Sequence, residues 1–317
     1  MDDLDRARKL WAAEQPTYES LVARVIAVLR SEFRDPGILI YGRPKKVDSI
    51  LKKLILKPDK TYESMTDKGG VRVVVRFTDK LDVVGNFIER RFPEHRKDDK
   101  RCSMKTDQVG YQAVHYDIQI TEDEDSKIVG LWAEVQVRTM GQHLWSEMSH
   151  GLAYKPGLSV PDPVRRWLMR LSALIEVADD EFLRVREALH QMPDYDTYKV
   201  LELLETQFYK FAAADYDKEL SINTINAFNH LYGAGGLAER SEEFDDFCQR
   251  RADRLSHVFD THRLVGDYPL FLFQPESLMI FQLLERDKFM LREEWVRHYP
   301  VKELEDLAIK WGIPYAS

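Results

Sequence analysis

The stretch AEVQVRTMGQHLWSEMSHGLAYK, residues 133–155, begins with the pattern of a β-strand and continues with the pattern of an α-helix. In its first part apolar and polar residues alternate, as they do when a strand has one buried face and one polar face. The polar face of this strand would carry Glu134, Gln136 and Arg138. A polar strand face is often simply solvated, so this stretch alone leaves solvent exposure and a binding site as open interpretations.

The helix that follows carries further reactive side chains on one face. His143, Glu147 and His150 lie at spacings of four and three, which places them above one another beside the polar end of the strand. Glu147 and His150 also match one ExxH element of a di-iron bundle. Such a bundle needs a second ExxH element and more inward-pointing glutamates, which we do not find in the sequence. A di-iron site is therefore not expected.

A cluster of cations occupies YGRPKKVDSILKKL, residues 41–54, where a short strand pattern passes into a helical pattern. The cluster consists of Arg43, Lys45, Lys46, Lys52 and Lys53, with Ser49 among them. Cations near the start of a helix oppose the helix dipole, which favours an anion bound among them. A solvated lysine-rich surface is the alternative interpretation.

A second carboxylate precedes GGVRVVVRF, residues 69–77, the strongest strand pattern in the sequence. Asp67 could hold a hard cation at the entrance of this strand, although it could equally be a turn residue. Arg72 could face a phosphate or a base. A carboxylate-bound magnesium ion among lysines and arginines is the usual composition of a phosphoryl-transfer site. Walker A, dinucleotide and kinase signatures are absent from the sequence, so the acceptor stays open.

Length and composition restrict the class of protein. The chain has 317 residues, enough for about two domains. Its net charge of -8 does not favour wrapping nucleic acid or lying on an anionic membrane. Its two cysteines are far apart, its acidic start lacks the regions of a signal peptide, and no apolar run approaches about 18 residues. We therefore expect a soluble cytoplasmic protein.

The order of the predicted elements indicates an α+β fold. Strand patterns within residues 36–43, 69–77, 113–120 and 131–139 are interspersed with helical patterns, which predicts a mixed β-sheet flanked by helices. From about residue 160 the chain is predicted to be almost entirely helical. We place a domain boundary between residues 1–191 and a mostly α-helical C-terminal region, residues 192–317. The aromatic stretch YPLFLFQPESLMIFQLL, residues 268–284, is predicted to be helical core rather than a ligand pocket.

Four motifs, taken in order, resemble the synthetase domain of the RelA/SpoT family, the (p)ppGpp synthetases. They are GRPKKVDSILKK, DKGGVRVVVRF, GYQAVH, and EVQVRT with the His, Trp, Glu, His and Tyr-Lys residues that follow it. The resemblance covers about residues 15–190. It implies a nucleotidyltransferase-like fold and a GTP/GDP pyrophosphokinase of the stringent response. Such an enzyme transfers the β,γ-pyrophosphate of ATP to the 3′-hydroxyl of GDP or GTP and releases AMP.

The resemblance also implies roles for residues on the ATP side of the site. Arg43 and Arg72 would clasp the adenine of ATP, and Lys45, Ser49 and Lys53 would hold its phosphates.

On the acceptor side, Asp67 and Glu134 would be the catalytic residues and would bind Mg²⁺, with Glu134 also activating the acceptor hydroxyl. Tyr111 would stack on the acceptor base. The other residues near the acceptor would be His115, Gln136 and Arg138. Pocket support would come from His143, Glu147, His150 and Lys155. For Glu147 and His150 we expect a buried supporting role, because membership of a motif does not distinguish support from catalysis.

One position departs from the family pattern. Many alarmone synthetases have a Lys four residues before the stacking Tyr, whereas this chain has Asp107 there, near Lys105. Repulsion between like charges opposes an Asp beside a diphosphate. The acceptor is therefore expected to be a guanosine nucleotide or, alternatively, an adenosine nucleotide or the 3′ end of tRNA, as in some toxic members. A non-catalytic module that binds a nucleotide or a partner is the second alternative.

Hydrolysis of the product is not expected. The family's hydrolase domain normally precedes the synthetase and uses a His-Asp metal motif, and the sequence contains no His-Asp dipeptide. The resemblance gives no role to residues 192–317. They could support a homo-oligomer, or bind an antitoxin or a regulatory partner.

Overall fold

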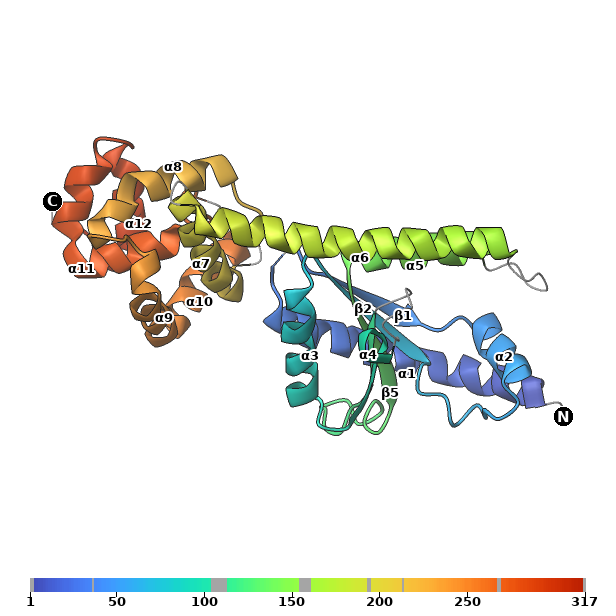
Figure 1. Ribbon diagram of the computed structural model, residues 1–317. Coiled ribbons are helices and arrows are strands. Elements are labelled where there is room, and N and C mark those ends of the chain that lie inside the picture. Colours follow the sequence, from blue (N-terminus) through green and yellow to red (C-terminus); the bar gives the residue numbers. More distant parts are fainter. Residues whose placement is uncertain are drawn as a thin grey trace. The chain divides into compact units, whose positions relative to one another are not determined.

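The computed structural model describes residues 3–35, 37–103, 113–153, 161–192, 195–212, 214–266 and 269–315. The chain divides into two compact units (Figure 1). The first unit comprises residues 1–31 and 37–185, and the second comprises residues 32–36 and 186–317. The division lies close to the boundary predicted at residue 191, inside the long helix α6 (Asp162–Gln191).

A mixed five-stranded sheet forms the centre of the described part of the first unit, in the order β1-β2-β5-β4-β3. Its strands are β1 (Leu39–Pro44), β2 (Gly69–Val75), β3 (His95–Asp99), β4 (Val114–Gln119) and β5 (Trp132–Thr139). Strands β2 and β5 are parallel, and the other neighbours are antiparallel. The mixed sheet confirms the predicted fold class. Strand β3 was not expected from the sequence, because HRKDD lacks the β-branched and apolar residues typical of strands.

One face of this sheet is the apolar core of the first unit. Alternation buries Val71 and Val73 of β2, and Val135 and Val137 of β5, completely. Helices α1 (Asp3–Glu32) and α3 (Asp79–Arg91) pack on this face. A Cβ added to Gly69 would lie 3.2 Å from the Val22 side chain of α1, so the close approach of helix and sheet depends on glycine here.

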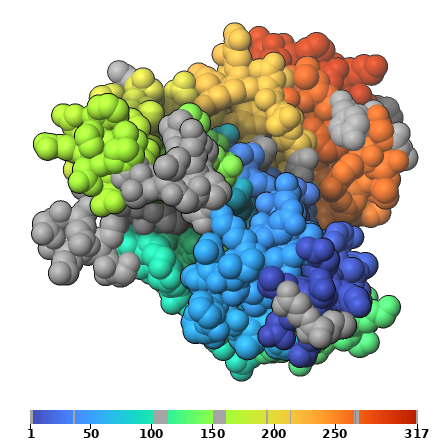
Figure 2. All heavy atoms as spheres, turned by 90° about the vertical axis from the view of Figure 1, so that its right-hand side faces the viewer, coloured from blue at the N-terminus to red at the C-terminus, as the bar shows by residue number. Residues whose placement is uncertain are grey.

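The remaining helices of the first unit are α2 (Val47–Leu56), α4 (Lys100–Ser103), α5 (Met140–Ala153) and most of α6. Helix α5 follows β5 directly, as the sequence predicts, and lies over the polar face of the sheet. Its start is held to α6 by a 2.5 Å hydrogen bond from the Thr139 hydroxyl to Asp179. Gly141 makes this contact possible, because a Cβ there would lie 2.7 Å from the Asp179 carboxylate. Figure 2 shows the light-blue residues around α2 at the surface of the unit, where Ile55 and Leu56 are exposed.

The second unit is helical in its described residues. Its elements are α7 (Asp196–Phe211), α8 (Lys218–Phe228), α9 (Ser241–Arg250), α10 (Ala252–Val265), α11 (Ser277–Trp295) and α12 (Val301–Lys310), with 3-10 turns η2 (Asn229–Tyr232) and η3 (Ala238–Arg240). Residues 271–284 of the aromatic stretch predicted to be core are buried: Phe281 stacks on Trp311 at 4.5 Å between ring centroids, and both are fully buried. None of the helices in the described ranges has the length and apolar composition that a membrane span requires.

Candidate active site

The polar face of the sheet is organised in two rows of side chains that run across the strands. Residues paired across neighbouring strands point to the same face. The first row contains Tyr41, Arg72, Gln136, His115 and Asp98. The second row contains Arg43, Gly70, Glu134, Asp117 and Arg96. Strand register therefore brings together residues as far apart in the sequence as Tyr41 and Gln136.

A cavity of about 310 Å³ opens on this face beside α2. Its lining includes four of the five residues predicted to bind ATP and both predicted metal carboxylates: Arg43, Lys45, Ser49, Arg72, Asp67 and Glu134. Gln136 lines it as well. The fifth predicted ATP residue, Lys53, reaches the same place from α2 through its contact with Asp67. The structure thus collects cations and carboxylates around one opening.

Two lysines hold the Asp67 carboxylate through the same oxygen. Lys53 Nζ donates to Oδ2 at 2.8 Å, and Lys45 Nζ donates to it as well. The other oxygen, Oδ1, is buried without a hydrogen-bond partner among the described residues. Burial acts to raise the pKa of Asp67, but the hydrogen bonds and charges of Lys45 and Lys53 outweigh it and lower the pKa below its ordinary value. Asp67 is therefore ionised at neutral pH and has one oxygen available.

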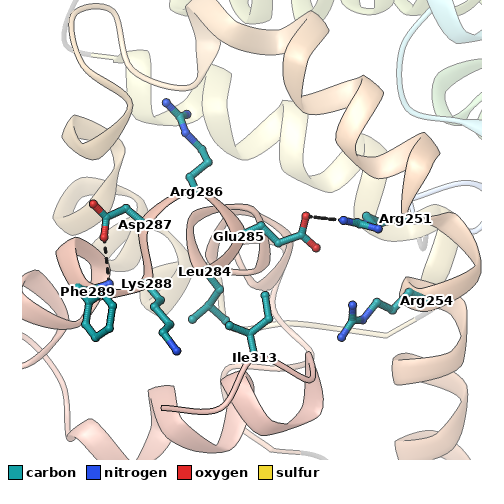
Figure 3. A pocket seen from close by; sticks show the side chains of 9 residues that line it. All are labelled: Arg251, Arg254, Leu284, Glu285, Arg286, Asp287, Lys288, Phe289 and Ile313. Carbon is teal, nitrogen blue, oxygen red and sulfur yellow. Dashed lines mark hydrogen bonds and ion pairs between the residues drawn. The ribbon is translucent and has the colours of Figure 1, made fainter. Parts of the chain in front are cut away.

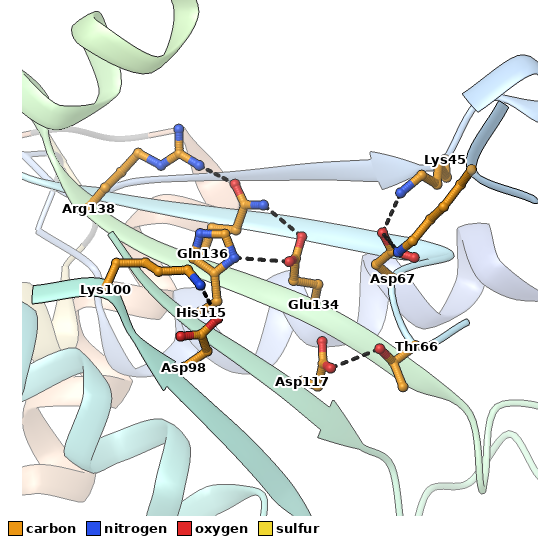
Figure 4. A network of polar contacts seen from close by, with 11 residues as sticks. Lys45, Thr66, Asp67, Asp98, Lys100, His115, Asp117, Glu134, Gln136 and Arg138 are labelled. Carbon is orange, nitrogen blue, oxygen red and sulfur yellow. Dashed lines mark hydrogen bonds and ion pairs between the residues drawn. The ribbon is translucent and has the colours of Figure 1, made fainter. Parts of the chain in front are cut away.

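Glu134 is oriented by neighbours on both sides, as Figure 4 shows. His115 Nδ1 lies 3.0 Å from Glu134 Oε1, and Gln136 Nε2 donates to Oε2 at 2.6 Å. Arg138, which is buried, donates to the amide oxygen of Gln136. Burial acts to raise the pKa of Glu134, but the contacts with His115 and Gln136 lower it overall. Because an ionised carboxylate only accepts hydrogen bonds, Nδ1 of His115 carries the proton in this arrangement.

A third carboxylate, Asp117, belongs to the same face and was missed in the sequence analysis. It pairs with Glu134 across β4 and β5, and Thr66 donates a 2.8 Å hydrogen bond to its Oδ2. Burial, together with the charges of Glu134 and Asp67, raises its pKa. The alternation of VHYDIQ, which puts Asp117 on the same side as His115, is the signal that predicts it.

Helix α5 supports the edge of the site. His143 Nε2 lies 3.2 Å from the Tyr41 hydroxyl, and Glu147 forms a 3.0 Å ion pair with Arg72. Burial and the charge of Arg138 lower the pKa of His143, so its ring is neutral at neutral pH. The expectation that Glu147 is buried is wrong: its side chain is 51% exposed, because it reaches from α5 toward Arg72 at the surface.

Some predicted site residues fall outside the described part of the chain. These are Tyr111, Asp107, Lys105 and Lys155, together with the side chain of His150. The roles predicted for them stay predictions.

Comparison with known proteins gives the class of the first unit. Residues 42–158 match the family model described as the region found in RelA / SpoT proteins. The span contains the cation cluster, Asp67, and the strands that carry His115 and Glu134. The first unit therefore contains the region found in RelA / SpoT proteins.

Individual relatives agree with this class. The GTP pyrophosphokinase YjbM of Bacillus subtilis is 29% identical over 157 residues, which cover 48% of this chain and 72% of YjbM. The GTP pyrophosphokinase YwaC of the same organism is 22% identical over 210 residues, 59% of this chain and 95% of YwaC. The crystal structure of small alarmone synthetase 1 from Bacillus subtilis, bound to its product pppGpp, has 25% sequence identity and a TM-score of 0.50. It covers 57% of this chain and 98% of that one.

Proposed function

We propose that the chain transfers the β,γ-pyrophosphate of ATP to the 3′-hydroxyl of GDP or GTP, forms (p)ppGpp and releases AMP. The observation that carries this proposal is the cavity in which Asp67 and Glu134 lie among Arg43, Lys45 and Arg72. Similarity to two proteins named GTP pyrophosphokinases supports it. So does the structure of a small alarmone synthetase bound to pppGpp.

The cations of the site suit a triphosphate. Lys45 and Lys53 point their ammonium groups at one oxygen of Asp67, so both charges already lie at the cavity. A bound triphosphate would offer them further oxygens and would draw them from the carboxylate. Arg72 has its guanidinium 5.9 Å from the Tyr41 ring, which suits a flat base placed beside them.

The carboxylates fit a magnesium ion. Mg²⁺ prefers oxygen ligands and is commonly held by one or two carboxylates together with substrate phosphates. Asp67 Oδ1 is a buried carboxylate oxygen without a partner among the described residues, and Glu134 lines the same cavity. Asp67 and Glu134 would hold the ion. When bound, it would neutralise charge on the transferred phosphates.

In this proposal Glu134 receives the proton of the acceptor hydroxyl. The 3′-oxygen attacks the β-phosphorus of ATP, and the bond from this phosphorus to the oxygen that bridges to the α-phosphorus breaks, so that AMP leaves. The lowered pKa keeps Glu134 ionised and able to accept, while His115 and Gln136 fix its two oxygens. Arg138 in turn fixes Gln136. The row of donors therefore orients the base before the acceptor binds.

The test uses ATP labelled at its β- and γ-phosphates, with magnesium, in separate reactions with GDP, GTP, no added acceptor, and tRNA. Label on GDP or GTP with release of AMP is the expected result. Label on tRNA or on an adenosine nucleotide would show that this molecule, and not a guanosine nucleotide, is the acceptor. Saturable nucleotide binding without any transfer would contradict the enzymatic proposal itself.

A further inference from the structure

The second unit contains a cavity that plays no part in the proposed reaction. It has a volume of about 550 Å³ and lies between α10, the middle of α11 and the segment that follows α12 (Figure 3). This volume falls within the range of about 300–1,000 Å³ that is common for small-molecule sites. The helical path of α11 is interrupted at Asp287, so the cavity lies beside a break in the helix.

The cavity is positively charged in a chain whose net charge is -8. Its charged lining consists of Arg251, Arg254, Arg286 and Lys288 against Glu285 and Asp287. Arg251 and Glu285 pair at 3.0 Å and neutralise each other. Asp287 accepts hydrogen bonds from the backbone N–H groups of Phe289 and Met290 at the restart of the helix. A concentration of one charge in a concave site attracts ligands of the opposite charge.

Two of these cations have no carboxylate partner in the described residues. The Arg254 guanidinium donates to the carbonyl oxygen of Trp311 and lies 4.6 Å from the Trp311 ring centroid. Lys288 Nζ donates to the carbonyl oxygen of Pro314 at 3.1 Å. Both partners are neutral, so they hold the charged groups in place without cancelling their charge. Arg254 and Lys288 are therefore positioned cations with further donors available.

An apolar surface separates the two cations. Figure 3 shows Leu284 and Ile313 between Lys288 on one side and Arg254 on the other. At the rim, Phe289 is 68% exposed, and its ring centroid lies 5.3 Å from Lys288 Nζ. An exposed aromatic ring next to a cation can stack on a flat ring that carries an anionic group.

We propose that this cavity binds a small organic polyphosphate that has a flat aromatic ring. Arg254 and Lys288 would contact the phosphate oxygens, since Arg and Lys recognise phosphate by charge and by N–H donors. Phe289, beside Lys288, would contact the ring, and Leu284 and Ile313 would contact the part of the ligand that runs from Lys288 to Arg254. The proposal gives the second unit a ligand and does not depend on the reaction proposed for the first unit.

The experiment measures hydrogen exchange of the full-length protein, resolved along the chain, during titration with inorganic pyrophosphate, ATP and GTP. Each nucleotide is expected to protect residues 251–254 and 284–290, the segments that line the cavity, from hydrogen exchange. Inorganic pyrophosphate is expected to protect them more weakly. Absence of protection in these segments with all three probes at millimolar concentration would overturn the proposal, as would equal protection by pyrophosphate and the nucleotides.

Two variants separate the two parts of the site. Arg254→Gln with Lys288→Gln is expected to weaken nucleotide protection of these segments by about tenfold or more, because charge-assisted hydrogen bonds are lost. The control variant, Arg250→Gln with Lys302→Gln, removes equal charge from the same unit outside the cavity. It is expected to change the nucleotide protection of these segments little. Phe289 is exposed, so Phe289→Ala should leave the fold intact. This variant should weaken the binding of ATP and GTP several-fold and leave the binding of pyrophosphate unchanged. Protection that is unchanged in Phe289→Ala would contradict the role of the ring.

Discussion

Replacement of Lys53 by Met should strengthen metal binding while it weakens the reaction with ATP. Lys53 Nζ lies 2.8 Å from Oδ2 of Asp67, whose carboxylate is proposed to hold magnesium. The Lys53 and Asp67 side chains are 26% and 16% exposed, so solvent screens the contact only in part. The metal must therefore compete with Lys53 and Lys45 for the same carboxylate.

The size of the effect follows from that contact. A hydrogen bond between charged groups contributes about 1.5–3 kcal/mol. Lys45 keeps its own contact with Asp67 in the variant, so we take the lower end of this range. About 1.4 kcal/mol corresponds to a tenfold change in a dissociation constant. The dissociation constant for Mn²⁺, used in place of Mg²⁺, should accordingly fall about tenfold without nucleotide.

The assay is a Mn²⁺ titration in which electron paramagnetic resonance reports the free ion. Lys46→Met is the matched control, since Lys46 is exposed at the start of α2 and, in the described part of the chain, Asp67 is held by Lys45 and Lys53 instead. It removes the same charge and should have a much smaller effect. In the same preparations, kcat/KM for ATP should fall in Lys53→Met only. Equal Mn²⁺ affinity in the Lys53 and Lys46 variants would refute the reasoning.

Three further changes test the packing and electrostatics of the two units. Burial raises the pKa of Glu276 to about 7 from its ordinary 4.5. The stability that this group contributes is therefore full below pH about 4.5 and is lost as pH rises through about 7, a difference of about 3 kcal/mol. Urea unfolding across this range should show that the free energy of unfolding falls as pH rises, and Glu276→Gln should abolish this pH dependence. If the variant keeps the pH dependence, other groups cause it. Trp311→Ala should cost the second unit about 3–5 kcal/mol, because the ring is fully buried against Phe281. An unchanged urea midpoint would contradict that packing. Gly42→Ala should destabilise the first unit, since the added Cβ would lie 2.5 Å from the Gly70 carbonyl oxygen of the paired strand. A urea midpoint equal to that of the wild-type protein would contradict this prediction.

The polar face of the site could be predicted because its information is local. Alternation in β5 places Glu134 and Gln136 on one side, and the same period in β4 places His115 and Asp117 together. Alternation within a strand does not predict the register between neighbouring strands. The pairing of His115 with Gln136, and of Asp117 with Glu134, depends on how β4 and β5 align in three dimensions.

Other features have long-range causes that the sequence does not express locally. Lys45 and Asp67 meet because β1 and β2 are antiparallel neighbours, with Lys45 and Asp67 beyond the ends of the two strands. Strand β3 forms from charged residues because it is an edge strand, where charged side chains are tolerated. Helix α1 begins at Asp3, and its early turns are held by Trp11, which is buried with its ring centroid 5.4 Å from that of Tyr18.

The cavity of the second unit could not be predicted from the sequence, because it also depends on long-range contacts. The sequence is predicted to be mostly helical here, and the interruption of α11 at Asp287 is visible only in the folded chain. Arg254 and Lys288 are 34 positions apart and reach one cavity through the packing of α10 on α11 and the C-terminal segment. Their isolated positive charge is a property of tertiary structure.

The central claim is that Glu134 serves a magnesium-dependent transfer from ATP. Its most direct test compares AMP release by the wild-type protein and by Glu134→Gln, with magnesium, ATP and GDP or GTP. Glu63→Gln, an exposed carboxylate that pairs with Arg6, is the matched control. Loss of AMP release in Glu134→Gln, with ATP binding and folding retained and the control fully active, is the predicted result. Wild-type AMP release by Glu134→Gln would contradict the account.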